Sequence, residues 1–209
     1  MKVGLLFDLD GTLLDTLGDL RNSVNFALSQ FGYPQRTLAE IRSFVGTGAR
    51  NLSRLSMPEG KDNVDEVLAA FPAHYKNHCN IETGPYAGIP AALEALKDIP
   101  MAIVSNKPDY AVKELAAIYF PGIYALGEVA GIPRKPAPDM VFKAMEAIGV
   151  EQCIYVGDSE PDVEVSKNVG CKCLSVLWGF RDEACLRGVG GEYFCSEPKD
   201  MLHILESMM

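Results

Sequence analysis

Hydrophobic residues along the chain form two kinds of pattern: short continuous runs, and longer stretches whose apolar positions are three and four residues apart. The short runs predict strands at 3–9, 101–105, 123–129, 154–156 and 171–177, with a short edge strand at 193–195. The spaced stretches predict helices at 89–96, 110–118, 140–148, 163–169 and 201–205. Because strands alternate with crossover helices, the pattern predicts an α/β fold with a mostly parallel, doubly wound sheet.

The segment from residue 16 to residue 83 interrupts this alternation. It contains helical patterns at 20–31, 38–44, 49–55 and 64–79, and no convincing strand. A structureless loop of this length does not suit a compact domain. We therefore predict a small helical cap domain at 16–83, inserted into an α/β core formed by residues 1–15 and 84–209.

Composition agrees with one folded core carrying an insert. The 209 residues are 48% hydrophobic and 22% charged, the balance of a globular protein. The formal net charge is −9 and Lys and Arg form no long run, so nucleic acid is a poor candidate partner. No apolar stretch approaches the ~18 residues of a membrane span and no charged leader precedes the first strand, so we expect no membrane association and a cytoplasmic location.

Cysteine and histidine residues add little chemistry. The six cysteines include no Cys-x-x-Cys pair, and we expect reduced, mostly buried thiols. His74 and His78 are four residues apart on a predicted helix, but no third ligand accompanies them. A surface or packing role is therefore favoured over a metal site.

Two acids follow the first predicted strand. Asp8 and Asp10 come at its carboxyl end, the edge of an open α/β sheet where ligands bind, and Gly11 permits a sharp turn after them. Side chains two residues apart in an extended segment face the same way. An acidic turn is one alternative. A calcium loop is another, but its sixth position needs glycine, where this chain has Leu13.

Other predicted strands also end in polar residues. Ser105-Asn106 follows one strand, and Asp158 and Asp162 follow another. Between these strands, Lys135 lies in a loop stiffened by prolines. Each feature alone has an ordinary explanation as a turn, a helix cap or a solvated lysine. Their convergence on one sheet edge is what points to a site.

Four gathered carboxylates require cations. Each close pair of like charges costs about 4 kcal/mol at ~4 Å with an effective dielectric near 20. An oxygen-rich site without partnered His or Cys favours a hard ion, and Mg²⁺ with several waters and a substrate phosphate fits better than zinc. Lys135 supplies a further positive charge.

As an ordered set, these residues resemble the haloacid dehalogenase-like superfamily of phosphotransferases, and within it the phosphoglycolate phosphatase-like branch with a helical cap. The resemblance covers essentially the whole chain. Its four motifs match Asp8-Leu9-Asp10-Gly11-Thr12, Ser105-Asn106, Lys135-Pro136-Ala137-Pro138-Asp139, and Gly157-Asp158-Ser159 with Asp162 and Gly170. It implies a Mg²⁺-dependent phosphatase that hydrolyses the phosphate monoester of a small metabolite through an aspartyl-phosphate intermediate.

The resemblance also implies roles for individual residues. Asp8 would be the nucleophile, and Asp10 would protonate the leaving group and then activate water. Mg²⁺ would be held by the Asp8 carboxylate, the Asp10 carbonyl and Asp158, with Asp162 ordering the outer shell. The transferring phosphoryl group would be neutralised by Ser105, Lys135 and amides near Asn106, and Thr12 would help to position Asp10.

Two other functions stay open. Sugar phosphomutases of the same superfamily keep both aspartates but usually carry an aliphatic residue where this chain has Thr12, which favours hydrolysis. A noncatalytic phospho-ligand-binding protein is the third interpretation, and the intact acids argue against it. Relatives that cleave carbon–halogen or phosphonate bonds lack an aspartate equivalent to Asp10.

Substrate choice is expected to lie in the cap. Gly48 and Arg50 resemble a loop and helix start that such caps turn toward the substrate, where Arg50 would pair with a substrate carboxylate. A glycine turn followed by an exposed arginine explains the same residues equally well. We expect a small phosphorylated metabolite as substrate and a monomer or weak dimer in solution.

Overall fold

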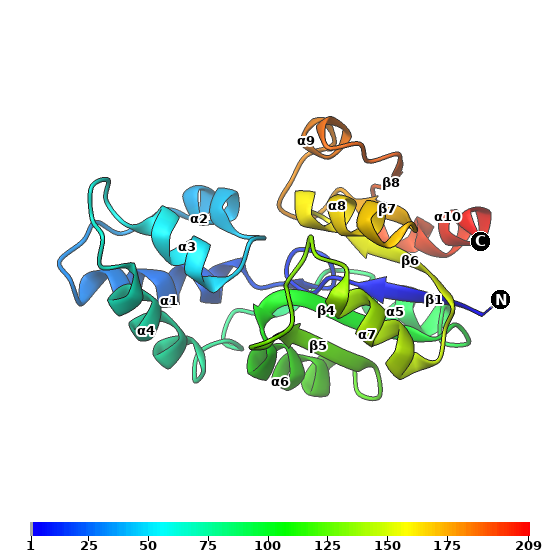
Figure 1. Cartoon of the computed structure of the whole chain (residues 1–209), viewed down its shortest axis with the longest axis horizontal. Coiled ribbons are helices and arrows are strands. Elements are labelled where there is room, and N and C mark those ends of the chain that lie inside the picture. Colours follow the sequence, from blue (N-terminus) through cyan, green and yellow to red (C-terminus); the bar gives the residue numbers. More distant parts are fainter. Residues whose placement is uncertain (1) are drawn as a thin grey trace.

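The computed structural model describes residues 2–209, and a six-stranded sheet forms the centre of its larger part (Figure 1). The strand order is β5-β4-β1-β6-β7-β8, and every neighbouring pair runs parallel. The strands are β1 (Val3–Phe7), β4 (Met101–Pro108), β5 (Tyr124–Glu128), β6 (Gln152–Gly157), β7 (Lys172–Val176) and β8 (Tyr193–Cys195). The predicted doubly wound parallel sheet is confirmed.

Helices cover both faces of this sheet. Leu5 and Phe7 of β1 share one hydrophobic cluster with residues of α5 (Ile89–Ala95), α6 (Asp109–Tyr119) and α10 (Met201–Met208). Leu6 belongs to a second cluster with residues of α7 (Asp139–Ile148) and α8 (Glu160–Val169). Because successive strand residues point to opposite faces, β1 is buried on both sides and its carboxyl end is held rigidly.

Four helices lie outside this sheet and pack on one another, at the left of Figure 1. They are α1 (Leu17–Ser29), α2 (Leu38–Phe44), α3 (Ala49–Ser56) and α4 (Val64–Tyr75). The chain enters them after β2 (Leu14–Asp15) and leaves them before β3 (Gly84–Pro85), and these two short strands pair antiparallel. We propose residues 16–83 as the cap domain and call them the cap below.

The structure differs from the sequence predictions mainly at element ends. The strand β4 continues to Pro108 rather than stopping at residue 105, and α8 begins at Glu160 rather than 163. Ser159 and Asp162 form a capping box that starts α8 earlier than its apolar spacing indicates. The short helices α9 (Glu183–Gly188) and η1 (Pro198–Asp200) were not predicted.

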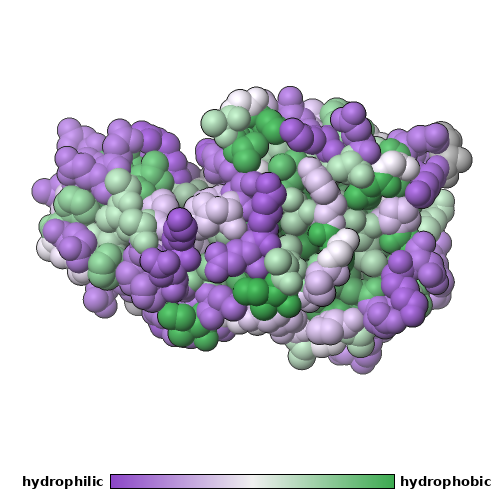
Figure 2. All heavy atoms as spheres, turned by 90° about the horizontal axis from the view of Figure 1, so that it is seen from below, coloured by the Kyte–Doolittle hydropathy of each residue, from purple (hydrophilic) through white to green (hydrophobic). Residues whose placement is uncertain are grey.

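The cysteine residues and the histidine pair of the cap have packing roles, outside the cluster of acids at the edge of the sheet. The six cysteines are free thiols. His74 hydrogen-bonds Ser23 at 3.0 Å and stacks on His78 with a centroid separation of 3.8 Å, which is a packing arrangement within the cap. Hydrophilic residues predominate at the cap end of the face in Figure 2, and smaller hydrophobic groups are scattered over the core. Among residues 2–209, no helix combines the length and apolar character needed to cross a membrane.

Candidate active site

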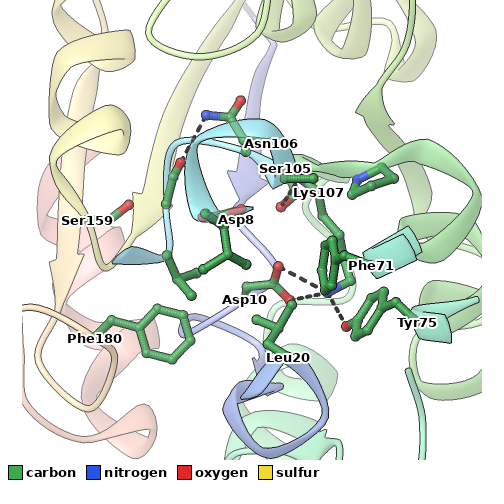
Figure 3. Close-up of a pocket in the computed structure, with 16 residues that line it drawn as sticks. Asp8, Asp10, Leu20, Phe71, Tyr75, Ser105, Asn106, Lys107, Ser159 and Phe180 are labelled. Carbon is green, nitrogen blue, oxygen red and sulfur yellow. Dashed lines mark hydrogen bonds and ion pairs between the residues drawn. The ribbon is translucent and has the colours of Figure 1, made fainter. Parts of the chain in front are cut away.

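A cavity of about 40 Å³ lies between the carboxyl edge of the sheet and the cap. Its floor is formed by residues at the end of β1 and β4, among them Asp8, Asp10 and Ser105. Apolar cap side chains, including Leu20 and Phe71, form much of the opposite side (Figure 3). The position agrees with the rule that open α/β sheets bind ligands beyond the carboxyl ends of their strands.

Asp8 is a buried acid at the floor of the cavity. Its residue is 6% exposed, and one carboxylate oxygen accepts a hydrogen bond from the amide of Leu9 at 2.7 Å. Burial raises the pKa of Asp8 to about 6, although the nearby Lys135 ammonium and a hydrogen bond from Ser105 act in the opposite direction. A carboxyl group whose pKa lies near neutrality and that pairs with a cation is well suited to act as a nucleophile.

Lys135 reaches the same point from the loop before α7. Its Nζ lies 3.1 Å from Oδ1 of Asp8 and 2.7 Å from Oδ1 of Asp162, and it donates to the hydroxyl of Tyr155 at 2.8 Å. Burial disfavours the charge, but Asp162 and Asp8 raise the pKa of Lys135 well above its ordinary value. The ammonium is therefore a permanent positive charge beside Asp8. Tyr155, which no sequence motif marks, donates in turn from its hydroxyl to the carbonyl of Val104 at 2.6 Å.

Asp158 and Asp162 follow β6. Asp158 is fully buried and accepts from the hydroxyl of Thr12 at 3.0 Å and from the amide of Phe180 at 2.7 Å. Asp162 accepts from the amides of Asp158 and Ser159 and holds Lys135 with its other oxygen. Thr12 thus contacts Asp158, whereas the sequence analysis placed it on Asp10.

Their donor chemistry makes these acids a candidate cation site. Carboxylate oxygens of Asp8, Asp158 and Asp162 lie within 4.8 Å of one another, and all three residues are buried. Burial, followed by repulsion from Asp162 and Asp8, raises the pKa of Asp158 well above its usual range. Negative charge is therefore in excess here, and a bound cation would relieve it. Asp162 is the most fully occupied of the three, since its Oδ1 pairs with the Lys135 ammonium and its Oδ2 accepts three hydrogen bonds from Asp158 and Ser159. Each oxygen of Asp158 accepts one hydrogen bond, so Asp8 and Asp158 are the better direct ligands.

Two glycines allow Asp158 to reach this position. A Cβ on Gly11 would lie 2.3 Å from Oδ2 of Asp158, and a Cβ on Gly179 would lie 2.3 Å from its Cβ. Gly11 also has φ of 83°, a left-handed conformation that side chains disfavour. The close approach of two loops to one carboxylate therefore requires glycine at both positions.

Asn106 and Lys107 connect the sheet edge to the cap. Nδ2 of Asn106 donates to the carbonyls of Lys135 and of Gly46, which belongs to the cap, at 2.9 and 3.1 Å. Nζ of Lys107 lies 2.8 Å from Oδ1 of Asp10. Lys107 was absent from the predicted site because Ser-Asn-Lys-Pro reads as a turn. The extension of β4 through this segment makes it part of the cavity.

The two cap residues predicted to face the substrate, Gly48 and Arg50, lie in different places relative to the cavity. Gly48 lines the cavity, but Arg50 is not among the lining residues. The Arg50 side chain is 54% exposed and forms an ion pair with Asp65 of α4. Arg50 therefore does not reach the cavity in this structure, and its contact with a substrate carboxylate stays a prediction.

Two arginines join cap and core on the other side of the cavity. Arg42 of α2 donates from Nε to the carbonyl of Phe180 at 3.1 Å and from Nη2 to that of Gly179. In return, Arg181 of the core donates to the carbonyls of Arg42 and Val45, each at 2.9 Å. Arg181 is also held by Glu160 at 2.8 Å. These contacts complement the exposed carbonyls at the end of α2.

Comparison with known proteins agrees with this fold and site. The family model of haloacid dehalogenase-like hydrolases matches residues 5–176. The phosphoglycolate phosphatase of Aquifex aeolicus is 32% identical, with 97% of this chain and 96% of the relative covered. That of Rhodobacter capsulatus is 34% identical, with 87% of each covered. A crystal structure from Lactobacillus delbrueckii subsp. bulgaricus, a phosphoglycolate phosphatase by provisional name, has a TM-score of 0.89 at 34% identity and 95% coverage of both chains.

The parallel sheet, the acids at its edge and these matches together define the class: the chain belongs to the haloacid dehalogenase-like hydrolases. The resemblance noted from the motifs is thereby confirmed. Within that family its curated relatives are phosphatases, and the chain is a phosphoric monoester hydrolase.

Proposed function

We infer that the protein is a Mg²⁺-dependent phosphatase that hydrolyses a small phosphate monoester resembling phosphoglycolate through an aspartyl-phosphate on Asp8. The observation that carries this proposal is the arrangement around Asp8, with Lys135 Nζ at 3.1 Å and the Asp158 carboxylate in the same buried cluster. The name of the relatives supports the substrate class. The small cavity, enclosed by apolar cap side chains, is compatible with a compact leaving group.

In the first half-reaction, a carboxylate oxygen of Asp8 attacks phosphorus in line, and the bond from phosphorus to the ester oxygen breaks. Asp10 gives its proton to the departing alkoxide, which leaves as an alcohol. Lys135 and Ser105 balance the charge on the phosphoryl oxygens during transfer.

In the second half-reaction, a water molecule attacks the phosphorus of the aspartyl-phosphate and gives a proton to Asp10. The bond between phosphorus and the Asp8 oxygen breaks, so inorganic phosphate leaves and Asp8 is restored. The proton that Asp10 receives from this water replaces the one it gave to the alkoxide in the first half-reaction. The cycle therefore closes without any net change in the protein.

Asp8, Asp158 and the Asp10 carbonyl would hold Mg²⁺, with Asp162 keeping Lys135 and the backbone after β6 in place. When bound, the ion supplies positive charge to the phosphoryl oxygens and offsets repulsion between them and Asp8.

Phosphate release from phosphoglycolate and from p-nitrophenyl phosphate tests the proposal. We expect turnover with Mg²⁺, its loss with a chelator, and its loss in Asp8→Asn, with phosphate found on the Asp8 peptide after acid quenching of the wild type. Asp98→Asn, an exposed acid in the loop after α5, is the matched control. Full turnover by Asp8→Asn would refute the covalent mechanism, and a requirement for a bisphosphate activator would indicate a mutase.

A further inference from the structure

Lys107 is a buried lysine whose ammonium lies between core and cap. It donates to the two carboxylate oxygens of Asp10 at 2.8 and 3.1 Å, and to the hydroxyl of Tyr75 at 2.6 Å. Figure 3 shows these contacts converging from the end of β4, the end of β1 and α4 of the cap. The Lys107 side chain is 1% exposed, so water does not compete for the ammonium.

Such a charge is stable only when its partners are fixed, because a buried ammonium without partners is strongly unfavourable. Tyr75 is 1% exposed and stacks on Phe71 with a centroid separation of 5.4 Å. The Lys107 ammonium lies 4.6 Å from the centroid of the Tyr75 ring. Tyr75 of the cap therefore interacts with Lys107 in two ways: its hydroxyl accepts a hydrogen bond from the ammonium, and its ring lies close to the same charge.

The position of Lys107 on β4 explains its reach. Ser105 and Lys107 are two residues apart and both line the cavity. Asn106, between them, contacts the cap through the carbonyl of Gly46 at 3.1 Å. The two residues that follow Ser105 thus contact two separate cap segments, the loop before α3 and the end of α4.

We propose that Lys107 is a positioning residue for Asp10, and that Tyr75 makes this positioning depend on closure of the cap. The inference rests on the proposed function, in which Asp10 transfers protons. When the cap moves away, Lys107 loses the Tyr75 hydroxyl and becomes accessible to water, so the Asp10 carboxyl is less confined. Proton transfer by Asp10 is then efficient only over a covered substrate.

A direct role in binding the leaving group is the alternative, because Lys107 lines the cavity. The two roles differ in how the effect of Lys107 depends on Asp10. A residue that acts through Asp10 loses its influence when Asp10 is removed, whereas a residue that touches substrate keeps it. A double-mutant cycle separates these cases.

The measurement is the single-turnover rate of Asp8 phosphorylation by phosphoglycolate and by p-nitrophenyl phosphate, whose leaving group needs no proton. We expect Lys107→Met to slow phosphorylation by phosphoglycolate about 100-fold, at the lower end of what general acid catalysis contributes. With p-nitrophenyl phosphate the loss is smaller. In the Asp10→Asn background, Lys107→Met changes either rate by about twofold or less.

Tyr75→Phe keeps the ring and removes the hydroxyl, and we expect a loss of roughly tenfold that also disappears in Asp10→Asn. This variant carries the test alone if Lys107→Met does not fold. Lys113→Met is the matched control, since Lys113 pairs with Asp109 at 2.6 Å on α6 and its side chain is 61% exposed. It is expected to leave all rates unchanged.

The outcomes are separable. A wild type that releases no phosphate refutes the proposed function, and this inference falls with it. An active wild type in which Lys107→Met or Tyr75→Phe keeps its full effect in the Asp10→Asn background, or has no effect at all, overturns this inference alone.

Discussion

At the residue level, Asp8 carries a negative charge that burial in the folded protein disfavours. Burial raises its pKa from 3.8 to about 6, so folding favours the protonated carboxyl. Stability from this group is fully present below the unfolded pKa of 3.8 and is lost as the pH rises through about 6. The acid that we propose as the nucleophile is therefore a source of instability in the metal-free protein at neutral pH.

This gives a stability prediction. In a chelator, Asp8→Asn should raise the free energy of unfolding at pH 7.5 by up to about 3 kcal/mol, because a shift of one pKa unit corresponds to about 1.4 kcal/mol. Denaturant titration at pH 7.5 and pH 5 measures it, and the difference between variant and wild type should shrink at the lower pH. Asp98→Asn should match the wild type at both pH values. A less stable Asp8→Asn protein at pH 7.5 would contradict the prediction.

Residue types at the sheet edge were predictable, but side-chain directions in the cap were not. Asp8 and Asp158 follow from strand ends, since parallel strands bring their carboxyl ends to one edge. Lys135 was predicted from its place in a proline-stiffened loop and from the motif that it begins. Arg50 is different, because its direction depends on Asp65 in another helix, and no local spacing reveals that ion pair. Lys107 was missed because its Ser-Asn-Lys-Pro segment has the sequence of a turn, and its contact with Tyr75, 32 residues away in the chain, cannot be read from local sequence.

At the level of elements, the loop after β7 is as important to the acids as the strands that carry them. The amide of Phe180 donates to Asp158, while the carbonyl of the same residue accepts from Arg42 of the cap. Gly179, which precedes it, packs so closely that no side chain fits. One short loop thus supports an acid on one side and the cap on the other.

Gly179→Ala tests this loop. The added Cβ would lie 2.3 Å from Cβ of Asp158 and 2.5 Å from the carbonyl oxygen of Gly11, so the acid has to move. We expect the apparent Mg²⁺ affinity, measured by calorimetry, to fall about 10- to 100-fold, as is usual when groups supporting a metal ligand are disturbed. Gly188→Ala, which meets no atom within 4 Å, is the control. Unchanged affinity in Gly179→Ala would show that the loop does not set the position of Asp158.

Long elements were predicted better than short ones. The strands β1 and β7 and helices such as α7 carry enough apolar positions to define a period. The two-residue strands β2 and β3 have no period, and their pairing depends on residues about 70 positions apart, Leu14 with Pro85 and Asp15 with Gly84. The six-residue α9 buries only Leu186 among its own residues, so its sequence shows no apolar face.

At the level of the whole molecule, cap and core are joined by reciprocal arginine contacts in addition to the covalent connections. Arg42 donates to core carbonyls and Arg181 donates to cap carbonyls. Hydrogen bonds from charged groups contribute about 1.5–3 kcal/mol each, so the closed arrangement depends measurably on these two side chains.

The double variant Arg42→Met with Arg181→Met should open the cap more often. We expect proteolysis within residues 76–83 to accelerate at least tenfold, which corresponds to about 1.4 kcal/mol of lost closure energy. The radius of gyration from small-angle scattering should rise in parallel. Arg187→Met removes an exposed arginine on α9 and should change neither quantity. Equal cleavage rates in the double variant and the wild type would mean that other contacts hold the cap.

The pairing of β2 with β3 has a consequence for how such proteins diversify. Asp15 and Gly84 are neighbours across two short strands, so the points where the inserted helices begin and end already lie together in the core. Replacing the helices by a different segment would demand little extra loop-closure entropy from the rest of the chain. A core of this kind could therefore receive a different inserted segment, and with it a different covering over the cavity, without any change in the acids at the sheet edge.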